Sequence, residues 1–176
     1  MILEEDIREK MVLDVANKMA IAARTAPKAR GIDNISIAIL CRDDIKKLSD
    51  KIKKMKEETP SLPQFFLRDA FNILSAQALL LLGTKINPMN LKPCSFCGFS
   101  SCAEKPKEHP CAFNTGDLGI AIGSAVSVAM DNRVDNRVMY TIGIAARKLG
   151  IFPEDVRIIY GIPLSVSEKN PFFDRK

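Results

Sequence analysis

Apolar residues recur at helical spacing in several segments of the chain. Between Glu4 and Arg24 they return every three or four positions, with charged residues on the opposite side, which predicts an amphipathic helix. The same reading predicts helices over residues 43–58, 65–76, 118–130 and 138–149. Asp117 is suited to cap the helix over 118–130, and Gly150 is suited to end the helix over 138–149.

Three shorter apolar runs lie between these predicted helices. They cover residues 35–41, 77–83 and 156–161. Their length, apolar content and flanking turn residues are typical of buried β-strands. Cys41 ends the first run and fits there as a small buried apolar residue. Residues 162–176 read as a polar tail that contains proline.

The predicted helix over 118–130 differs from the others because it is apolar on almost every side. Its small residues, such as Gly119, Ala121 and Gly123, permit close backbone approach. A helix of this kind belongs in a core or in a subunit interface. Together with the predicted helix over residues 138–149, it offers more apolar surface than one layer of helices in a single chain would bury. We therefore expect a homodimer built partly on these two helices.

Composition narrows the class of protein. A chain of 176 residues with 47% hydrophobic and 27% charged residues fits one globular domain over 1–176. No run of eighteen apolar residues predicts a membrane span. The net charge of +5 is modest, and no RNA-binding or helix-turn-helix signature supports a nucleic acid partner. No signal peptide opens the sequence, so we expect a cytoplasmic protein.

Four of the five cysteines fall within eighteen residues, at Cys94, Cys97, Cys102 and Cys111. Thiolates are soft ligands that suit zinc or an iron–sulfur cluster. The spacing C-x2-C-x4-C-x8-C is compact, as in ferredoxin motifs, whereas structural zinc sites usually join two cysteine pairs across a dozen or more residues. These cysteines are therefore predicted to bind a 4Fe–4S cluster. The alternative is a structural zinc ion that staples a loop over residues 84–116 and carries no redox chemistry.

The residues around the cysteines fit a cofactor loop. Gly98 permits a tight turn beside the second cysteine, and Phe96 and Phe99 are candidates to exclude water. His109, the only histidine, is a rival fourth ligand, but low-potential clusters normally take four thiolates. We expect His109 to be an exposed loop residue. A disulfide framework is disfavoured because cytosolic cysteines are rarely paired.

The turn after the first helix carries Lys28, Arg30 and Gly31. One interpretation is a solvated turn in which Gly31 adopts positive φ. The other is an anion cradle for the phosphate of a cofactor. The sequence leaves both open.

These motifs carry two resemblances. The motif Cys94-x-x-Cys97-Gly-Phe-x-x-Cys102 resembles that of an uncharacterised family of ferredoxin-domain-containing proteins. Most of the chain is similar to the flavin-dependent nitroreductase fold. That resemblance implies an α+β fold with a mixed sheet flanked by helices, into which the cysteine-rich loop 84–116 is inserted. It also implies an intertwined homodimer with FMN at the interface.

The implied flavin contacts differ from the usual nitroreductase pattern. The arginine-rich opening is absent, so Lys28, Arg30, Lys169 and Arg175 would supply the phosphate charge instead. The expected function is a 4Fe–4S redox protein, either for electron transfer with a redox partner protein or as an FMN-dependent oxidoreductase. No catalytic acid, base or nucleophile stands out, so no substrate is named.

Overall fold

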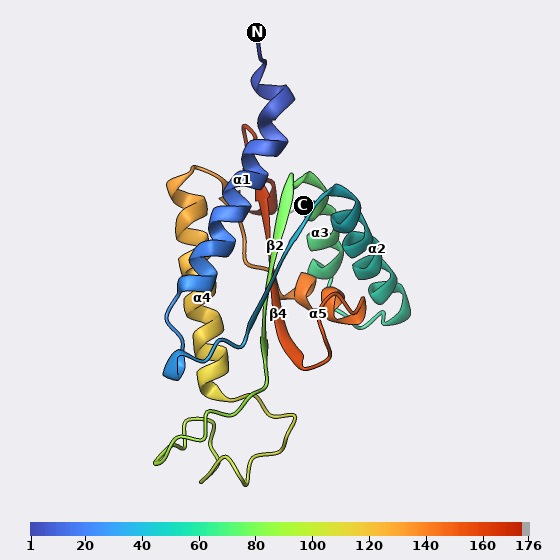
Figure 1. The fold of residues 1–176 in the computed structure, drawn as a ribbon. Coiled ribbons are helices and arrows are strands. Elements are labelled where there is room, and N and C mark those ends of the chain that lie inside the picture. Colours follow the sequence, from blue (N-terminus) through green and yellow to red (C-terminus); the bar gives the residue numbers. More distant parts are fainter. Residues whose placement is uncertain (174–176) are drawn as a thin grey trace.

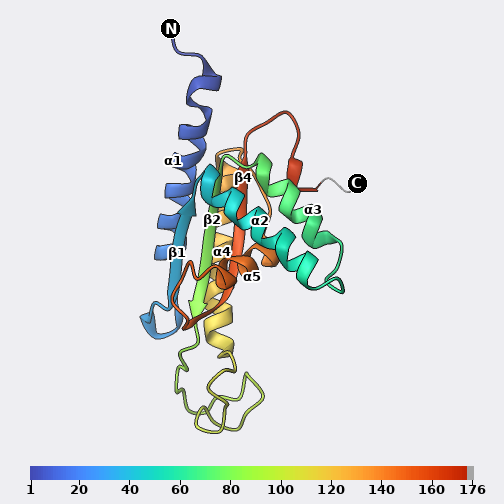
Figure 2. The ribbon, with the colours of Figure 1, turned by 90° about the vertical axis from the view of Figure 1, so that its right-hand side faces the viewer.

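The computed structural model describes residues 1–173, which form one four-stranded sheet with helices on both faces (Figures 1 and 2). The strand order is β1-β2-β4-β3. The strands are β1 (Ile35–Leu40), β2 (Ala78–Lys85), β3 (Asp135–Asn136) and β4 (Val156–Ser165). The α-helices are α1 (Glu4–Thr25), α2 (Arg42–Glu58), α3 (Phe65–Asn72), α4 (Ala112–Asp131) and α5 (Tyr140–Lys148).

The two faces of the sheet build two separate cores. Helices α1 and α4 cover one face, and α2, α3 and α5 cover the other (Figure 1). Side chains of a strand alternate between faces, so Leu79 and Leu81 of β2 enter one core while Leu80 and Leu82 enter the other. Strand β2 is therefore the central strand, buried on both sides.

Every strand pair in the described chain is antiparallel, where a mixed sheet was predicted. The connections explain the difference. A single crossover helix would return the chain to the starting end of a strand and give a parallel neighbour. Two helices, α2 and α3, join β1 to β2 instead. They bring the chain back to the end where β1 finished, so β2 runs in the opposite direction.

Several predicted boundaries were wrong. Helix α4 begins at Ala112 rather than after Asp117, which is a buried residue of its second turn. Strand β4 continues to Ser165, because Ile162 and Leu164 fill the core beneath α1 and α4. Cys41 is exposed at the N-cap of α2 rather than buried at the end of the strand, because β1 already ends at Leu40.

The strand register shows which segments lie at each end of the sheet. Ile35 pairs with Thr84, and Thr84 pairs with Ile158, so the turn before β1 and the segment after β2 lie at one end. Leu79 pairs with Leu40 and with Pro163 at the other end, where the chain continues toward the C-terminus (Figure 2). Among residues 1–173, no helix is both long and apolar enough to cross a membrane.

Candidate functional site

The cysteine-rich segment over residues 86–111 connects β2 to α4 without forming a helix or strand. It extends from one end of the sheet (Figure 1). Hydrogen bonds to asparagine side chains hold the start of this segment in place. The backbone N–H of Asn87 donates to Asn114 Oδ1 at 2.9 Å, and Asn87 Nδ2 donates to Asn34 Oδ1 at 3.0 Å. The first residues of the segment are thus tied to α4 and to the start of β1.

The segment brings two of the four predicted ligands together. Cys94 and Cys102 line one pocket of about 430 Å³, and Cys97 is half-buried outside that lining. All five cysteines are free thiols. Within residues 1–173, no group of three or more Cys, His, Asp or Glu side chains is already assembled around a single metal position.

Cys111 occupies a different environment from the other three. It is 5% exposed and stands at the N-cap of α4, with an extended backbone conformation. The N-terminus of a helix carries partial positive charge from its unpaired N–H groups. Cys111 therefore lies beside these N–H groups, at the point where the segment joins the folded body.

A buried cation lies between the third and fourth cysteines. Lys105 is 6% exposed, and its ammonium donates to the carbonyl oxygens of Pro106, at 3.1 Å, and His109. No carboxylate pairs with Lys105 in the described chain. Burial of a charge without an opposite charge is costly. A negatively charged metal–thiolate centre nearby would compensate it.

Two aromatic contacts involve residues of the segment. Phe96 is 77% exposed and stacks on Phe113 with 5.5 Å between ring centroids. It therefore does not exclude water from the segment, although the sequence made it a candidate for that role. Phe99 contacts His109 edge-on at 5.0 Å. His109 is exposed, as the sequence predicted.

The basic turn at the same end of the sheet is held by contacts within the protein. Lys28 Nζ donates to three carbonyl oxygens at the C-terminal end of α1, including those of Ala23 at 2.9 Å and Ala26 at 2.7 Å. Arg30, at φ 56°, donates to the carbonyl of Met89 at 3.0 Å. The turn is therefore fastened to α1 and to the cysteine-rich segment.

A carboxylate also contacts this turn. The backbone N–H of Ala29 donates to both oxygens of Asp117 in α4, at 3.1 Å each. The turn thus binds an anion already, but that anion belongs to the protein. Asp33, which follows the turn, is partly buried, which by itself raises the pKa of its carboxyl. The hydrogen bond from Arg24, the Ile35 N–H and the nearby charges of Arg24 and Lys28 outweigh burial and lower that pKa below its ordinary value.

The predicted flavin contacts do not meet within one chain. Lys28 and Arg30 lie at the β1-start end of the sheet, whereas Lys169 follows β4 at the opposite end. Arg175 lies outside the described residues. The contacts of Asp117, Asn87 and Asn114 could not be predicted from the sequence. Their partners stand 27 to 88 positions away, and no local pattern encodes such pairings.

Comparison with solved structures shows the fold. A nitroreductase with bound FMN from Desulfitobacterium hafniense matches with a TM-score of 0.61 at 12% identity, over 89% of this chain and 78% of that one. A nitroreductase with bound FMN from Bacteroides fragilis gives 0.59 at 12%, over 93% and 81%. A BluB-like flavoprotein from Clostridium difficile gives 0.54 at 19%, over 89% and 81%. The predicted α+β, nitroreductase-like fold is confirmed.

Comparison of sequences shows the family. An uncharacterised protein of Archaeoglobus fulgidus is 41% identical over 181 residues, which cover 98% of this chain and 96% of that protein. The family described as "Uncharacterized protein containing a ferredoxin domain" matches residues 107–175. That match includes Cys111, and the other three predicted ligands precede it. The chain belongs to this family of uncharacterised proteins that contain a ferredoxin domain.

Proposed function

We propose that this protein is an iron–sulfur redox protein in which Cys94, Cys97, Cys102 and Cys111 bind one 4Fe–4S cluster. The observation that carries the proposal is the placement of four free thiols on one segment outside the sheet, with Cys94 and Cys102 in the same pocket. Membership of a ferredoxin-domain family and a flavoprotein-like fold both support a redox function.

The donor set fits such a cluster chemically. Four thiolates are the ordinary ligands of a 4Fe–4S cluster, which transfers one electron at a time when bound. Cys94 and Cys102 supply two donors from the pocket, and Cys111 supplies one from the N-terminus of α4. The irregular backbone around Cys97, with Gly98 at φ 85°, lets the segment close around a bulky group. Lys105, which is buried in the same segment, would offset the negative charge of such a cluster.

Exposure of this segment supports exchange of electrons with another protein. Ser95, Gly98 and Ser100 are exposed, and Cys97 is half-buried between them. A cluster held here would lie near the surface, within reach of a redox partner protein. The sheet and helices would serve as the rigid support that fixes both ends of the segment.

The test of ligand identity is a series of serine variants. Each of Cys94→Ser, Cys97→Ser, Cys102→Ser and Cys111→Ser should lose most of the iron of the parent protein after oxygen-free purification. Cys41→Ser is the matched control, because Cys41 lies at the opposite end of β1. Iron loss in Cys41→Ser, with retention in the other four, would reject the assignment.

FMN is the second proposed cofactor, because solved nitroreductases with bound FMN share the fold. Lys28 and Arg30 would contact the phosphate from one protomer, and Lys169 and Arg175 would contact it from the other. Two chains are needed because the turn and Lys169 lie at opposite ends of one sheet. FMN titration of the parent and of Lys28→Ala/Arg30→Ala tests this site. Equal affinity of the two proteins would remove it.

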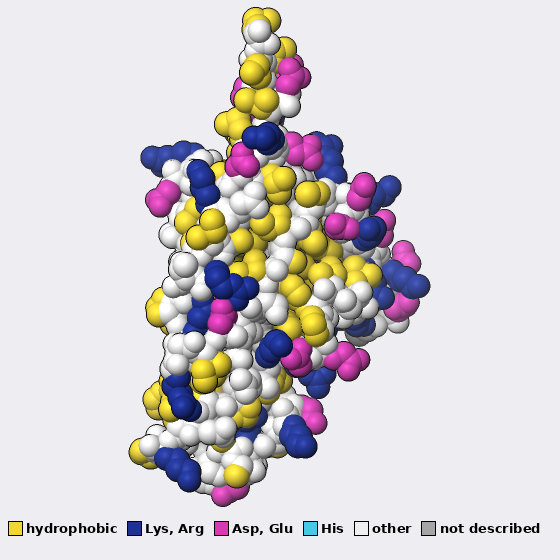
Figure 3. Space-filling model, viewed as in Figure 1, with side chains coloured by type: hydrophobic (Ala, Val, Ile, Leu, Met, Phe, Trp, Pro, Cys, Tyr) yellow, Lys and Arg dark blue, Asp and Glu magenta, His cyan; other side chains and the backbone are white. Residues whose placement is uncertain are grey.

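We also propose a homodimer, because the described chain leaves apolar surface and a strand edge uncovered. On α4, Gly119, Gly123 and Met130 are exposed. Figure 3 shows hydrophobic side chains gathered over β1, between the two helical layers, and on the projecting start of α1. In residues 1–173 no strand pairs with the outer edge of β1, and such an edge invites pairing with another chain. Sedimentation should give a dimer at micromolar concentration, and a monomer would refute the proposal.

A further inference from the structure

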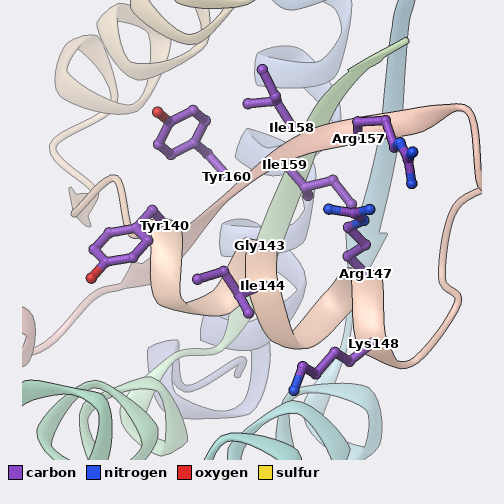
Figure 4. Close-up of a pocket in the computed structure, with 9 residues that line it drawn as sticks. All are labelled: Tyr140, Gly143, Ile144, Arg147, Lys148, Arg157, Ile158, Ile159 and Tyr160. Atoms are coloured by element: carbon purple, nitrogen blue, oxygen red, sulfur yellow. The ribbon is translucent and has the colours of Figure 1, made fainter. Parts of the chain in front are cut away.

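A cleft of about 550 Å³ lies between α5 and the start of β4, and no residue of the cysteine-rich segment or of the basic turn lines it. Its volume is in the range of small-molecule sites. Ile144 of α5 and Ile158 of β4 provide apolar lining, and Tyr140 and Tyr160 stand at one side (Figure 4). The cleft thus offers flat and apolar surface to the body of a ligand.

Two arginines define the other side of the cleft. Arg147 from α5 and Arg157 from β4 extend toward each other (Figure 4), while Lys148 points away from them. In the described chain, neither arginine forms an ion pair with an acidic side chain. The nearby Asp155 is already paired with Lys85 at 3.0 Å. Two adjacent guanidinium groups therefore share one unneutralised region.

Helix electrostatics explains only one of these two cations. A basic residue in the last turn of a helix interacts favourably with the carbonyl end, which accounts for Arg147 in α5. Arg157 stands on the neighbouring strand and gains nothing from that effect. Guanidinium groups bind phosphate in forked, bidentate geometry. Their convergence at one side of an apolar cleft points to an anionic group joined to a flat body.

We propose that this cleft binds a nucleotide-class phosphate ester, with the phosphate on Arg147 and Arg157 and the ring against Ile144 and the tyrosines. Inorganic phosphate alone would leave most of the 550 Å³ unfilled. An uncharged nucleoside would leave the arginines unpaired. The site shares no residue with the proposed cluster or flavin contacts, so it stands independently of them.

Calorimetric titration with AMP, adenosine and inorganic phosphate tests the proposal. AMP should bind at least tenfold more tightly than either of the other two. Arg147→Ala/Arg157→Ala should weaken AMP binding at least tenfold. The melting temperature of this double variant should stay close to that of the parent. Arg147→Lys/Arg157→Lys should recover only part of the affinity, because lysine lacks the fork.

The matched control removes the same charge elsewhere. Lys10→Ala/Lys18→Ala changes two exposed lysines of α1, on the opposite face of the sheet, and should bind AMP as the parent does. Equal weakening in the control would trace the effect to net charge and overturn the site. Absence of AMP binding to the parent at millimolar concentration, or unchanged binding to the double arginine variant, would also overturn it.

Discussion

The carboxylate of Asp117 accepts both of its 3.1 Å hydrogen bonds from the backbone N–H of Ala29, 88 positions earlier in the chain. This contact joins the second turn of α4 to the turn that follows α1. Cys111 begins the same helix, so the last proposed cluster ligand and the basic turn are fixed to one another through α4. Changes at either place are therefore expected to affect the other.

Replacement of Asp117 tests this link. Asp117→Ala should lower the free energy of unfolding by about 1.5–3 kcal/mol, the range for a hydrogen bond to a charged group. Asp117→Asn should recover part of it, since an amide oxygen still accepts from Ala29. Urea unfolding gives both values. If FMN phosphate binds at the turn, removing this competing carboxylate should also tighten FMN binding, and weaker binding would contradict that site.

Close packing of α5 on β4 gives a second prediction. A Cβ added at Gly143 would lie 1.7 Å from the carbonyl oxygen of Ile159, so Gly143→Ala must push the helix away from the strand. We expect a loss of at least about 2 kcal/mol. Gly116→Ala, at an exposed position of α4 where nothing lies within 4 Å, should be neutral or stabilising by up to about 1 kcal/mol. Similar melting temperatures for both variants would contradict this packing.

The lowered pKa of Asp33 predicts a pH-dependent contribution to stability. Because the folded value lies below the unfolded one, the stabilisation is present above the ordinary value of about 3.9 and is lost as the pH falls through the folded value. Arg24 pairs with Asp33 at 2.5 Å but is half exposed, so solvent screening limits the effect to about 1 kcal/mol or less.

Asp33→Asn provides the measurement. The variant should be less stable than the parent at pH 7, and the gap should close in acid as the parent carboxyl becomes protonated. Thermal unfolding at a series of pH values measures this difference in stability between the variant and the parent. A gap that stays constant down to pH values below the ordinary pKa of aspartate would refute the role of the Asp33 charge.

The buried ammonium of Lys105 is expected to affect the reduction potential of the proposed cluster. Net charge near a cluster sets its reduction potential, and a buried positive charge favours the reduced form. Lys105→Met should lower the potential, with a tenfold change in the one-electron equilibrium equal to about 59 mV. Lys107→Met, which removes an exposed charge two residues away, should change it far less. Equal shifts in a redox titration of both variants would contradict a specific role for Lys105.

Much of the fold could be predicted because most of the helices show apolar residues at helical spacing. The face of α1 that includes Val12, Met19 and Ala23 is buried as its spacing indicated. The start of α4 was missed because Asn114, Thr115 and Gly116 are weak helix formers. Their helical conformation depends on contacts with residues elsewhere in the chain, such as that between Asn114 and Asn87.

The candidate site was less accessible to prediction than the fold. The cysteine spacing identifies a set of thiols, but neither the pocket shared by Cys94 and Cys102 nor the N-cap position of Cys111 follows from spacing. Lys105 reads as an ordinary loop lysine in the sequence. Its burial depends on how the segment folds back over its own carbonyl groups.

The most direct test of the central claim is the content of iron, acid-labile sulfide and zinc in the parent protein purified without oxygen. A 4Fe–4S cluster on the four cysteines predicts about four irons and four sulfides per chain, with little zinc. About one zinc per chain, with neither iron nor sulfide, would contradict the redox proposal and identify a structural metal site instead.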